Sequence, residues 1–288
     1  MIKEKIDLHV HVSRFAIPAQ GKMQISSAEE MLPHFKKLGI KKAVIMSAGE
    51  MNSPIGSNAD NLAIVKEYPQ NYAWMCNVDP VDIENMEQRI VACKEQGAMG
   101  IGELMINQRL DSPMLQEIFR IAQKYNMPVT FHMSPEVGFG YGVVDDPGLP
   151  LLEKTLQTYE NLKLLGHSQS FWIEMSKDAP KEKEKRNEWG KGPVIKGGRV
   201  PELFEKYPNL YGDLSANSAG CAIMRDSDFG LAFLERFAGR LFFATDMVNN
   251  QMVFPLGAWL DEQVETGKLS QTAYDKICFE NAHEIFGI

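Results

Sequence analysis

The feature that most constrains the fold of this chain is a regular alternation of short β-rich runs with longer segments of helical periodicity. Eight apolar runs, flanked by Gly, Pro, Asn or Asp, recur along the 288 residues. The expected strands are Ile6–Val12, Lys42–Ser47, Tyr72–Val78, Ala98–Leu104, Pro128–Met133, Leu162–His167, Leu210–Leu214 and Leu241–Thr245. The expected helices are Ala28–Leu38, Asn58–Glu67, Ile83–Gln96, Pro113–Tyr125, Pro150–Tyr159, Val200–Tyr207, Asp228–Phe237, Pro255–Thr266 and Ser270–Phe286. This pattern predicts a (β/α)₈ TIM barrel of the α/β class, in one domain over residues 1–288.

A doubly wound open sheet is the alternative architecture. Such a sheet more often carries a glycine-rich phosphate loop after its first strand. Here the first strand is followed by Ser13, Arg14 and Phe15, with no glycine motif. The barrel is therefore the favoured prediction.

Composition excludes several classes of function. The formal net charge of −8 disfavours binding to nucleic acid or to an anionic membrane surface. No apolar run approaches the roughly 20 residues that cross a bilayer. The first residues do not read as a secretion signal, and the four cysteines form no CxxC pair. We therefore expect a cytoplasmic protein with free thiols, a small-molecule substrate and, in common with many barrels, self-association into a homo-oligomer.

The chain contains only six histidines, and four of them fall in the expected strands. His9 and His11 alternate with aliphatic residues on the first strand. We expect the aliphatic residues to face the helices and both imidazoles to face the barrel axis. Asp7 shares their face but lies deeper, and we expect it to accept hydrogen bonds rather than to bind a ligand. His34 and His283 lie in helical segments and are expected to be structural or exposed.

Further histidines and acids end other strands, at the face where barrel active sites form. His132 ends the fifth strand, His167 the sixth and Asp246 the eighth, while Glu103 closes the fourth. Each has a simpler explanation alone: a core histidine, a helix cap, or an ion pair of Glu103 with Arg109. Together they predict a site for Zn²⁺ or another divalent transition metal, because unpaired acids and imidazoles are costly to bury.

These residues resemble the amidohydrolase superfamily, in particular the amidohydrolase-related group that includes 2-amino-3-carboxymuconate-6-semialdehyde decarboxylase. The resemblance runs the length of the chain and rests on an ordered set of motifs. They are Asp7 to His11, His132, Gly166-His167, Tyr211 to Ser215, Thr245-Asp246 and Asn281-Ala282. It implies a metal-bearing barrel with hydrolase or decarboxylase activity. The implied ligands are His9, His11, His132 and Asp246, with His167 assisting catalysis.

Glu103 leaves the number of ions open. A carboxylate on the fourth strand resembles the bridging ligand of dinuclear members of the superfamily, in which His132 and His167 would hold a second ion. The resemblance thus implies one or two ions.

Three functions remain as hypotheses. In the first, metal-activated water attacks an amide, lactone or ester, with Asp246 as ligand and general base and His167 polarising the carbonyl. In the second, a carboxylated aromatic or muconate-like substrate loses CO₂, with Arg199 or Arg225 pairing its remaining charge. In the third, the metal is a structural centre of a barrel without activity.

Residues just past the strand ends are the candidates for substrate binding. The expected contacts are Ser134, Trp172, Asn217 and Arg225. The charged segment 177–196 interrupts the alternation after the sixth strand. We expect it to be a solvated insertion, or alternatively a lid that uses Trp172 and Trp189 as apolar contacts.

Overall fold

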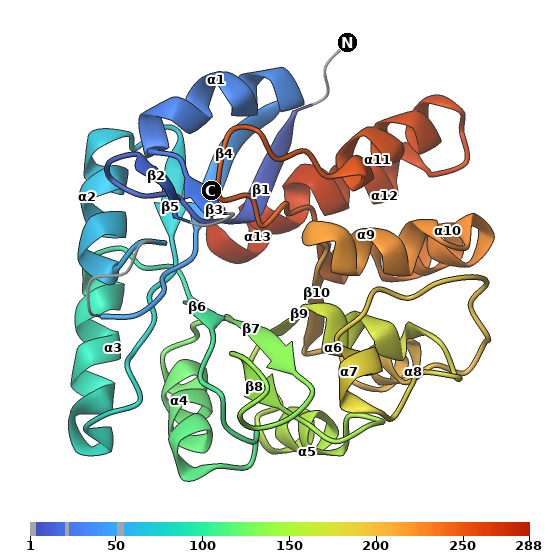
Figure 1. Ribbon diagram of the computed structural model, residues 1–288, viewed down its shortest axis with the longest axis horizontal. Coiled ribbons are helices and arrows are strands. Elements are labelled where there is room, and N and C mark those ends of the chain that lie inside the picture. Colours follow the sequence, from blue (N-terminus) through green and yellow to red (C-terminus); the bar gives the residue numbers. More distant parts are fainter. Residues whose placement is uncertain (1–3, 21–22, 51–54) are drawn as a thin grey trace.

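The computed structural model describes residues 4–20, 23–50 and 55–288, which form a ring of parallel strands surrounded by helices (Figure 1). All eight expected strands are present at the expected places. They are β1 (Lys5–Val10), β4 (Ile40–Ile45), β5 (Tyr72–Trp74), β6 (Ile101–Leu104), β7 (Val129–Ser134), β9 (Leu164–His167), β10 (Leu210–Asp213) and β11 (Leu241–Phe242). Shorter strands lie outside the ring, namely the antiparallel pair β2 (Ile17–Gln20) and β3 (Met23–Ile25), and β8 (Val143–Val144) beside β7.

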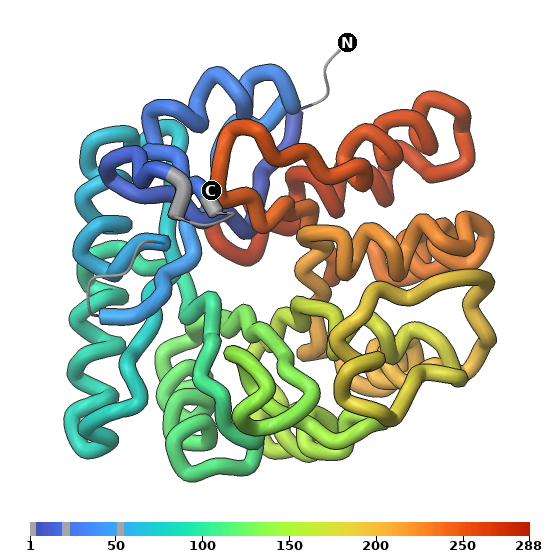
Figure 2. The backbone as a smooth tube through the Cα atoms, in the orientation of Figure 1, coloured from blue at the N-terminus to red at the C-terminus, as the bar shows by residue number. Residues whose placement is uncertain are grey.

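The strands follow one another around the ring in chain order. Two parallel sheets, β1-β4-β5 and β6-β7-β9-β10-β11, are joined by the single bridges Cys76↔Ile101 and Val10↔Met247. The backbone N–H of Leu8 also donates to the carbonyl of Phe243 at 3.0 Å. Figure 2 shows the chain advancing in order around the ring, from blue through green to red. The predicted (β/α)₈ barrel is confirmed.

The outer helices begin and end where local sequence signals place them. They are α1 (Ala28–Leu38), α2 (Asn58–Glu67), α3 (Met86–Glu95), α4 (Pro113–Lys124), α5 (Pro150–Thr158), α8 (Arg199–Lys206), α10 (Ser227–Phe237) and α11 (Pro255–Glu265). Ser27 and Glu30 form a capping box at the start of α1, and Gly39 ends it at φ +75°. Within the described residues, no helix is both long and apolar enough to cross a membrane.

The helical segments after β10 and at the end of the chain differ from the prediction. Helix α9 (Ala216–Met224) was not expected, because its small residues and Gly220 give a weak helical pattern. The expected final helix is instead divided into α12 (Gln271–Asp275), a π-helical turn (Lys276–Glu280) and α13 (Asn281–Phe286). In that turn the carbonyl of Ile277 accepts a hydrogen bond from the N–H of Phe243. The irregular turn thus bonds to the segment that continues β11.

The first strand departs from the expected alternation of inward and outward side chains. Ile6 and Leu8 do not face the helices; they pack in a cluster drawn from strands around the ring, which places them inside the barrel. That cluster also contains Val44, Met46, Met75, Leu165, Phe242, Ala244 and Ala282. Val10 packs with residues of α1 in the outer cluster. The β1–β4 register shifts between Asp7 and Val10, and this irregularity lets the strand change the face it presents.

A network on the outside of the barrel fastens α5 to α8. The carboxylate of Glu153 on α5 binds Arg199, accepts from Lys206 Nζ at 2.7 Å and from Tyr207 Oη at 2.8 Å. Hydrogen bonds from Lys206 and Tyr207 lower the pKa of Glu153 to about 2, from an ordinary 4.5. Because the folded pKa is depressed, this contribution to stability is complete above about pH 4.5 and is lost as the pH falls toward 2.

We therefore expect Glu153→Gln to lower the free energy of unfolding by about 1 kcal/mol at pH 7 and by progressively less below pH 4.5. Denaturant unfolding of both proteins at a series of pH values measures the loss of stability at pH 7 and its decrease below pH 4.5. Glu160→Gln, at an exposed position on the same side of the barrel, is the matched control. A difference between Glu153→Gln and wild type that does not change with pH would contradict this account.

Candidate active site

A buried acid at the start of the chain anchors the site. Asp7 is fully buried and accepts from Thr245 Oγ1 at 2.6 Å, from Thr245 N at 3.0 Å and from His9 N at 3.1 Å. Burial raises its pKa to about 7, although these hydrogen bonds oppose the shift. Asp7 is thus a hydrogen-bond acceptor, as expected, and it links β1 to the segment after β11.

Three side chains converge at the carboxyl ends of β1 and β11. His9 Nε2 and His11 Nε2 lie 3.2 Å apart, and each is 3.4 Å from Asp246 Oδ1. The backbone N–H of Asp246 donates to the carbonyl of His9 at 2.7 Å, which holds the two segments together. These donors come from opposite ends of the chain and meet only because the barrel closes.

Glu103 occupies the centre of the cluster. Its Oε2 lies 3.3 Å from His11 Nε2 and 3.7 Å from His9 Nε2. Its Oε1 lies 2.7 Å from His132 Nδ1 and 3.4 Å from His167 Nε2. The structure therefore brings together all six residues expected at the site, with the Glu103 carboxylate between the β1 histidines and those of β7 and β9.

Asp213, the last residue of β10, and Ser215, two residues after it, also contact the site, although neither is expected there from the sequence. Asp213 Oδ2 lies 2.6 Å from His9 Nδ1, and its Oδ1 accepts the N–H of Ser215 at 3.1 Å. Ser215 Oγ lies 2.7 Å from His167 Nδ1. These contacts turn the Nε2 atoms of His9 and His167 toward the cluster. Asp213 ends a strand like the residues that were identified, so the same rule would have found it.

The electrostatics of the cluster follow from burial and close charge. Burial disfavours the charged form of His9, but Asp213 and Asp246 outweigh it and hold its pKa well above the ordinary value. Burial also opposes ionisation of Glu103 and Asp213, yet His132 and His9 respectively hold their pKa values low. Burial lowers the pKa of His167. The site thus keeps carboxylates ionised beside imidazoles.

This donor set fits a divalent metal ion. In the ion pairs of the described residues, Glu103, Asp213 and Asp246 meet only histidines, never Lys or Arg. Ligands at 2.0–2.2 Å in tetrahedral geometry lie about 3.3–3.6 Å from one another. Two groups have all ligand atoms within 4.8 Å of one another: His9, His11 and Asp246, and His9, Glu103 and His167. His132 belongs to neither group and contacts Glu103.

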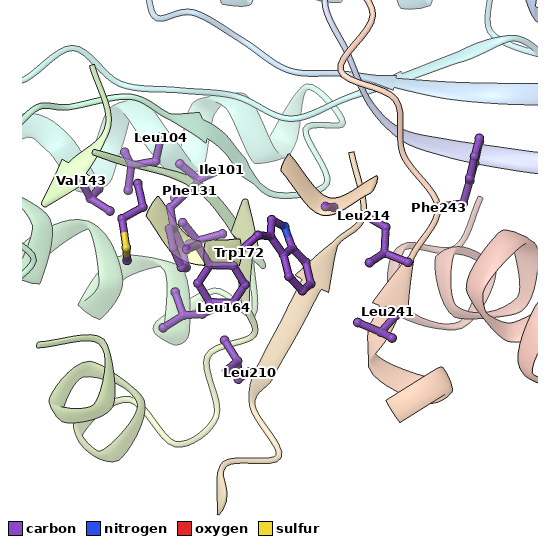
Figure 3. Packing of buried hydrophobic residues seen from close by; sticks show 14 of the residues in the cluster. Ile101, Leu104, Phe131, Val143, Leu164, Trp172, Leu210, Leu214, Leu241 and Phe243 are labelled. Carbon is purple, nitrogen blue, oxygen red and sulfur yellow. The ribbon is translucent and has the colours of Figure 1, made fainter. Parts of the chain in front are cut away.

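The four expected substrate contacts have different surroundings. Trp172 is 1% exposed, donates through Nε1 to the carbonyl of Asp213, and packs among core residues (Figure 3). Arg225 donates to the carbonyl of Lys191. Trp172 thus packs in the core and Arg225 holds a loop, and their expected substrate contacts stay a prediction. Ser134 ends β7, and Asn217 lies half-buried at the start of α9.

The charged segment 177–196 is mostly exposed, as expected of an insertion. Its short helix α7 (Lys183–Arg186) carries one buried residue, Arg186, which donates to the carbonyls of Pro135 and Asp145 at 3.2 and 2.9 Å. Trp189 is 48% exposed. The segment is therefore fastened to the loop after β7. His34 binds the carbonyl of Met252 and His283 is exposed, so both lie outside the cluster.

Comparison with known proteins identifies the family of the chain and similar folds. A family model described as amidohydrolase matches residues 6–288. No match was found among curated proteins. Among solved structures, the chain is similar to a probable 2-pyrone-4,6-dicarboxylic acid hydrolase from Acinetobacter baumannii with citric acid bound, at TM-score 0.62 and 14% identity, covering 99% of this chain and 100% of that one.

Two decarboxylases show comparable similarity. The 2,6-dihydroxybenzoate decarboxylase from Rhizobium matches at TM-score 0.62 and 14% identity, covering 99% of each chain. A 5-carboxyvanillate decarboxylase from Novosphingobium aromaticivorans, complexed with manganese and 4-hydroxy-3-methoxy-5-nitrobenzoic acid, matches at 0.62 and 15%, covering 99% of this chain and 96% of that one. At these identities the structural matches establish the fold alone.

The anchoring role of Asp7 gives a direct prediction. Thr245→Val keeps the shape of the side chain but removes the hydroxyl that Asp7 accepts from, in a fully buried setting. We expect it to lower the free energy of unfolding by about 1–3 kcal/mol, measured by denaturant titration. Thr158→Val, which removes an exposed hydroxyl bonded to the carbonyl of Lys154, is the control. Equal effects of the two substitutions would contradict the anchoring role.

Proposed function

The chain belongs to the amidohydrolase family, and on that premise we propose that it is a metal-dependent hydrolase acting on an amide, lactone or ester bond of a small molecule. One observation supports hydrolysis most directly. The Glu103 carboxylate contacts His9 and His11 through Oε2 and His132 and His167 through Oε1, so it would be shared if two cations were held by these histidines. A shared carboxylate is typical of two-metal hydrolytic sites.

The proposed ligands are the six residues of the cluster. His9, His11 and Asp246 would hold one ion, with Glu103 beside them. His132 and His167 would complete a second position on the other side of Glu103. Zn²⁺ is the proposed ion, and another divalent transition metal would suit the same nitrogen and oxygen donors. A bound ion would polarise the scissile carbonyl and make a water molecule acidic near neutral pH.

Asp246 is the proposed general base. Its side chain is 27% exposed, whereas that of Glu103 is 4% and that of Asp213 is fully buried. Asp246 is thus the carboxylate of the cluster that a substrate and its water can approach. It would take a proton as water adds to the carbonyl and pass it to the leaving group.

His167 is the second proposed catalytic group. Its Nδ1 is held by Ser215 Oγ, so its Nε2 faces the cluster, 3.4 Å from Glu103 Oε1 and 3.7 Å from Asp246 Oδ2. From there it would either polarise the carbonyl or complete the second ion's ligands. Ser134, the last residue of β7, and Asn217, at the start of α9, remain proposed substrate contacts.

The alternative function is non-oxidative decarboxylation, which two of the similar structures are named for. A carboxylated substrate would bring another negative charge beside Glu103 and Asp246. Among the described residues, the two arginines considered for its remaining charge have other partners: Arg199 binds Glu153 and Glu202, and Arg225 binds a loop carbonyl. This arrangement favours hydrolysis.

Isotope labelling separates the two reactions. The metal-loaded protein is incubated in H₂¹⁸O with γ-butyrolactone, phenyl acetate and acetanilide, and separately with 2,6-dihydroxybenzoate. We expect one ¹⁸O atom in the acid product of at least one of the first three compounds. We also expect Asp246→Asn to reduce kcat/KM at least about 100-fold, because the general base is lost.

Asparagine suits this test because it tolerates the left-handed backbone of Asp246, at φ +58°. His283→Gln, an exposed histidine outside the cluster, is the matched control and should keep full activity. Release of CO₂ from the carboxylated compound with no ¹⁸O uptake from the others would overturn the proposal in favour of decarboxylation. Full activity of Asp246→Asn would overturn the role of Asp246.

A further inference from the structure

The loop after β7 carries an aromatic residue that the proposed function has not used. Tyr141 lies near the end of residues 135–142, a segment with glycines at 138, 140 and 142. The segment is fastened immediately after Tyr141. Gly142 N–H donates to the carbonyl of Met105 at 2.8 Å, and its own carbonyl accepts from Asn107 Nδ2 at 3.0 Å. Val143 then pairs with Met133 in β8, so Tyr141 sits on fixed backbone rather than at a free loop tip.

The Tyr141 ring lies directly on a residue of the cluster. Its centroid is 4.4 Å from that of His132, with an angle of 47° between the rings. Gly142 makes this approach possible, since a Cβ there would lie 2.6 Å from the carbonyl oxygen of His132, and its φ is +103°. Backbone geometry therefore sets the ring against His132.

The Tyr141 hydroxyl is open to an incoming molecule. A tyrosine phenol is a neutral hydrogen-bond donor near neutral pH. Within the described part of the chain, no hydrogen bond engages this hydroxyl. The residue as a whole is 57% exposed, so an incoming molecule can reach it. A neutral donor beside a cluster of carboxylates and imidazoles is suited to an oxygen atom that gains negative charge.

We propose that Tyr141 is a substrate-binding residue of this site, whose hydroxyl donates a hydrogen bond to the carbonyl oxygen of an ester, lactone or amide. The proposal rests on the proposed function and adds to it an exposed residue that would contact the substrate. His132 contacts the ring, and Gly142 permits the close approach of the loop to His132. The ring and the hydroxyl have separable roles, because phenylalanine keeps the first and removes the second.

Binding of a fixed probe tests the contact without turnover. Benzohydroxamate, a planar acyl compound with two oxygens, is titrated calorimetrically into metal-loaded wild type and Tyr141→Phe. We expect the Kd to rise about threefold to tenfold in the variant, the effect of one neutral hydrogen bond. Gly142→Ala keeps the hydroxyl but displaces the ring, and it should weaken binding at least as much. Tyr125→Phe, which removes a hydroxyl bonded to Glu87 on the outer helices, is the matched control and should bind as wild type.

The outcomes separate this proposal from the proposed function. Equal Kd values for wild type and Tyr141→Phe would overturn the Tyr141 contact and leave hydrolysis standing. A higher Kd for Tyr141→Phe than for wild type, with no ¹⁸O uptake from any ester, lactone or amide, would support the Tyr141 contact and overturn the proposed hydrolase function. Failure of the probe to bind wild type would count against both. Equal thermal midpoints of wild type and Tyr141→Phe are expected and exclude misfolding as the cause.

Discussion

The site depends on negative charge held inside a closed barrel. Glu103, Asp213 and Asp246 share histidine partners, and within the described part of the chain they form no ion pair with Lys or Arg. Buried carboxylates are costly unless a cation or strong hydrogen bonds accompany them. His9 accordingly holds a proton more tightly than an ordinary histidine. A divalent cation would replace that proton and balance more of the charge.

The fold meets this requirement by bringing distant segments to one end of the barrel. Five strands, namely β1, β6, β7, β9 and β10, carry a histidine or acid of the site, and the closure of β1 against β11 brings His9 within 3.4 Å of Asp246. The irregularity of β1 accompanies the turn of His9 and His11 toward the cluster. Asp7, earlier on the strand, accepts a hydrogen bond from Thr245 instead. Strand order and one local departure from alternation together position the proposed ligands.

The sequence predicted the strands, most helices and the set of residues that the structure brings together, because strand periodicity and polar strand ends are local signals. It could not predict the inward packing of Ile6 and Leu8, since a register shift depends on the neighbouring strand. The roles of Trp172 and Arg225 also depend on tertiary packing. Tyr141 lies in a glycine-rich loop without periodicity, and its placement on His132 follows from contacts with Met105 and Asn107.

Anomalous diffraction tests the central claim most directly. Crystals grown with Zn²⁺ and measured at the zinc absorption edge locate bound ions without reference to activity. The account predicts an anomalous peak among His9, His11 and Asp246, from an ion with one coordination position not filled by protein. If two ions bind, it predicts a second peak beside His132 and His167, with Glu103 between the two peaks. Well-ordered crystals with no anomalous peak inside this cluster would contradict it.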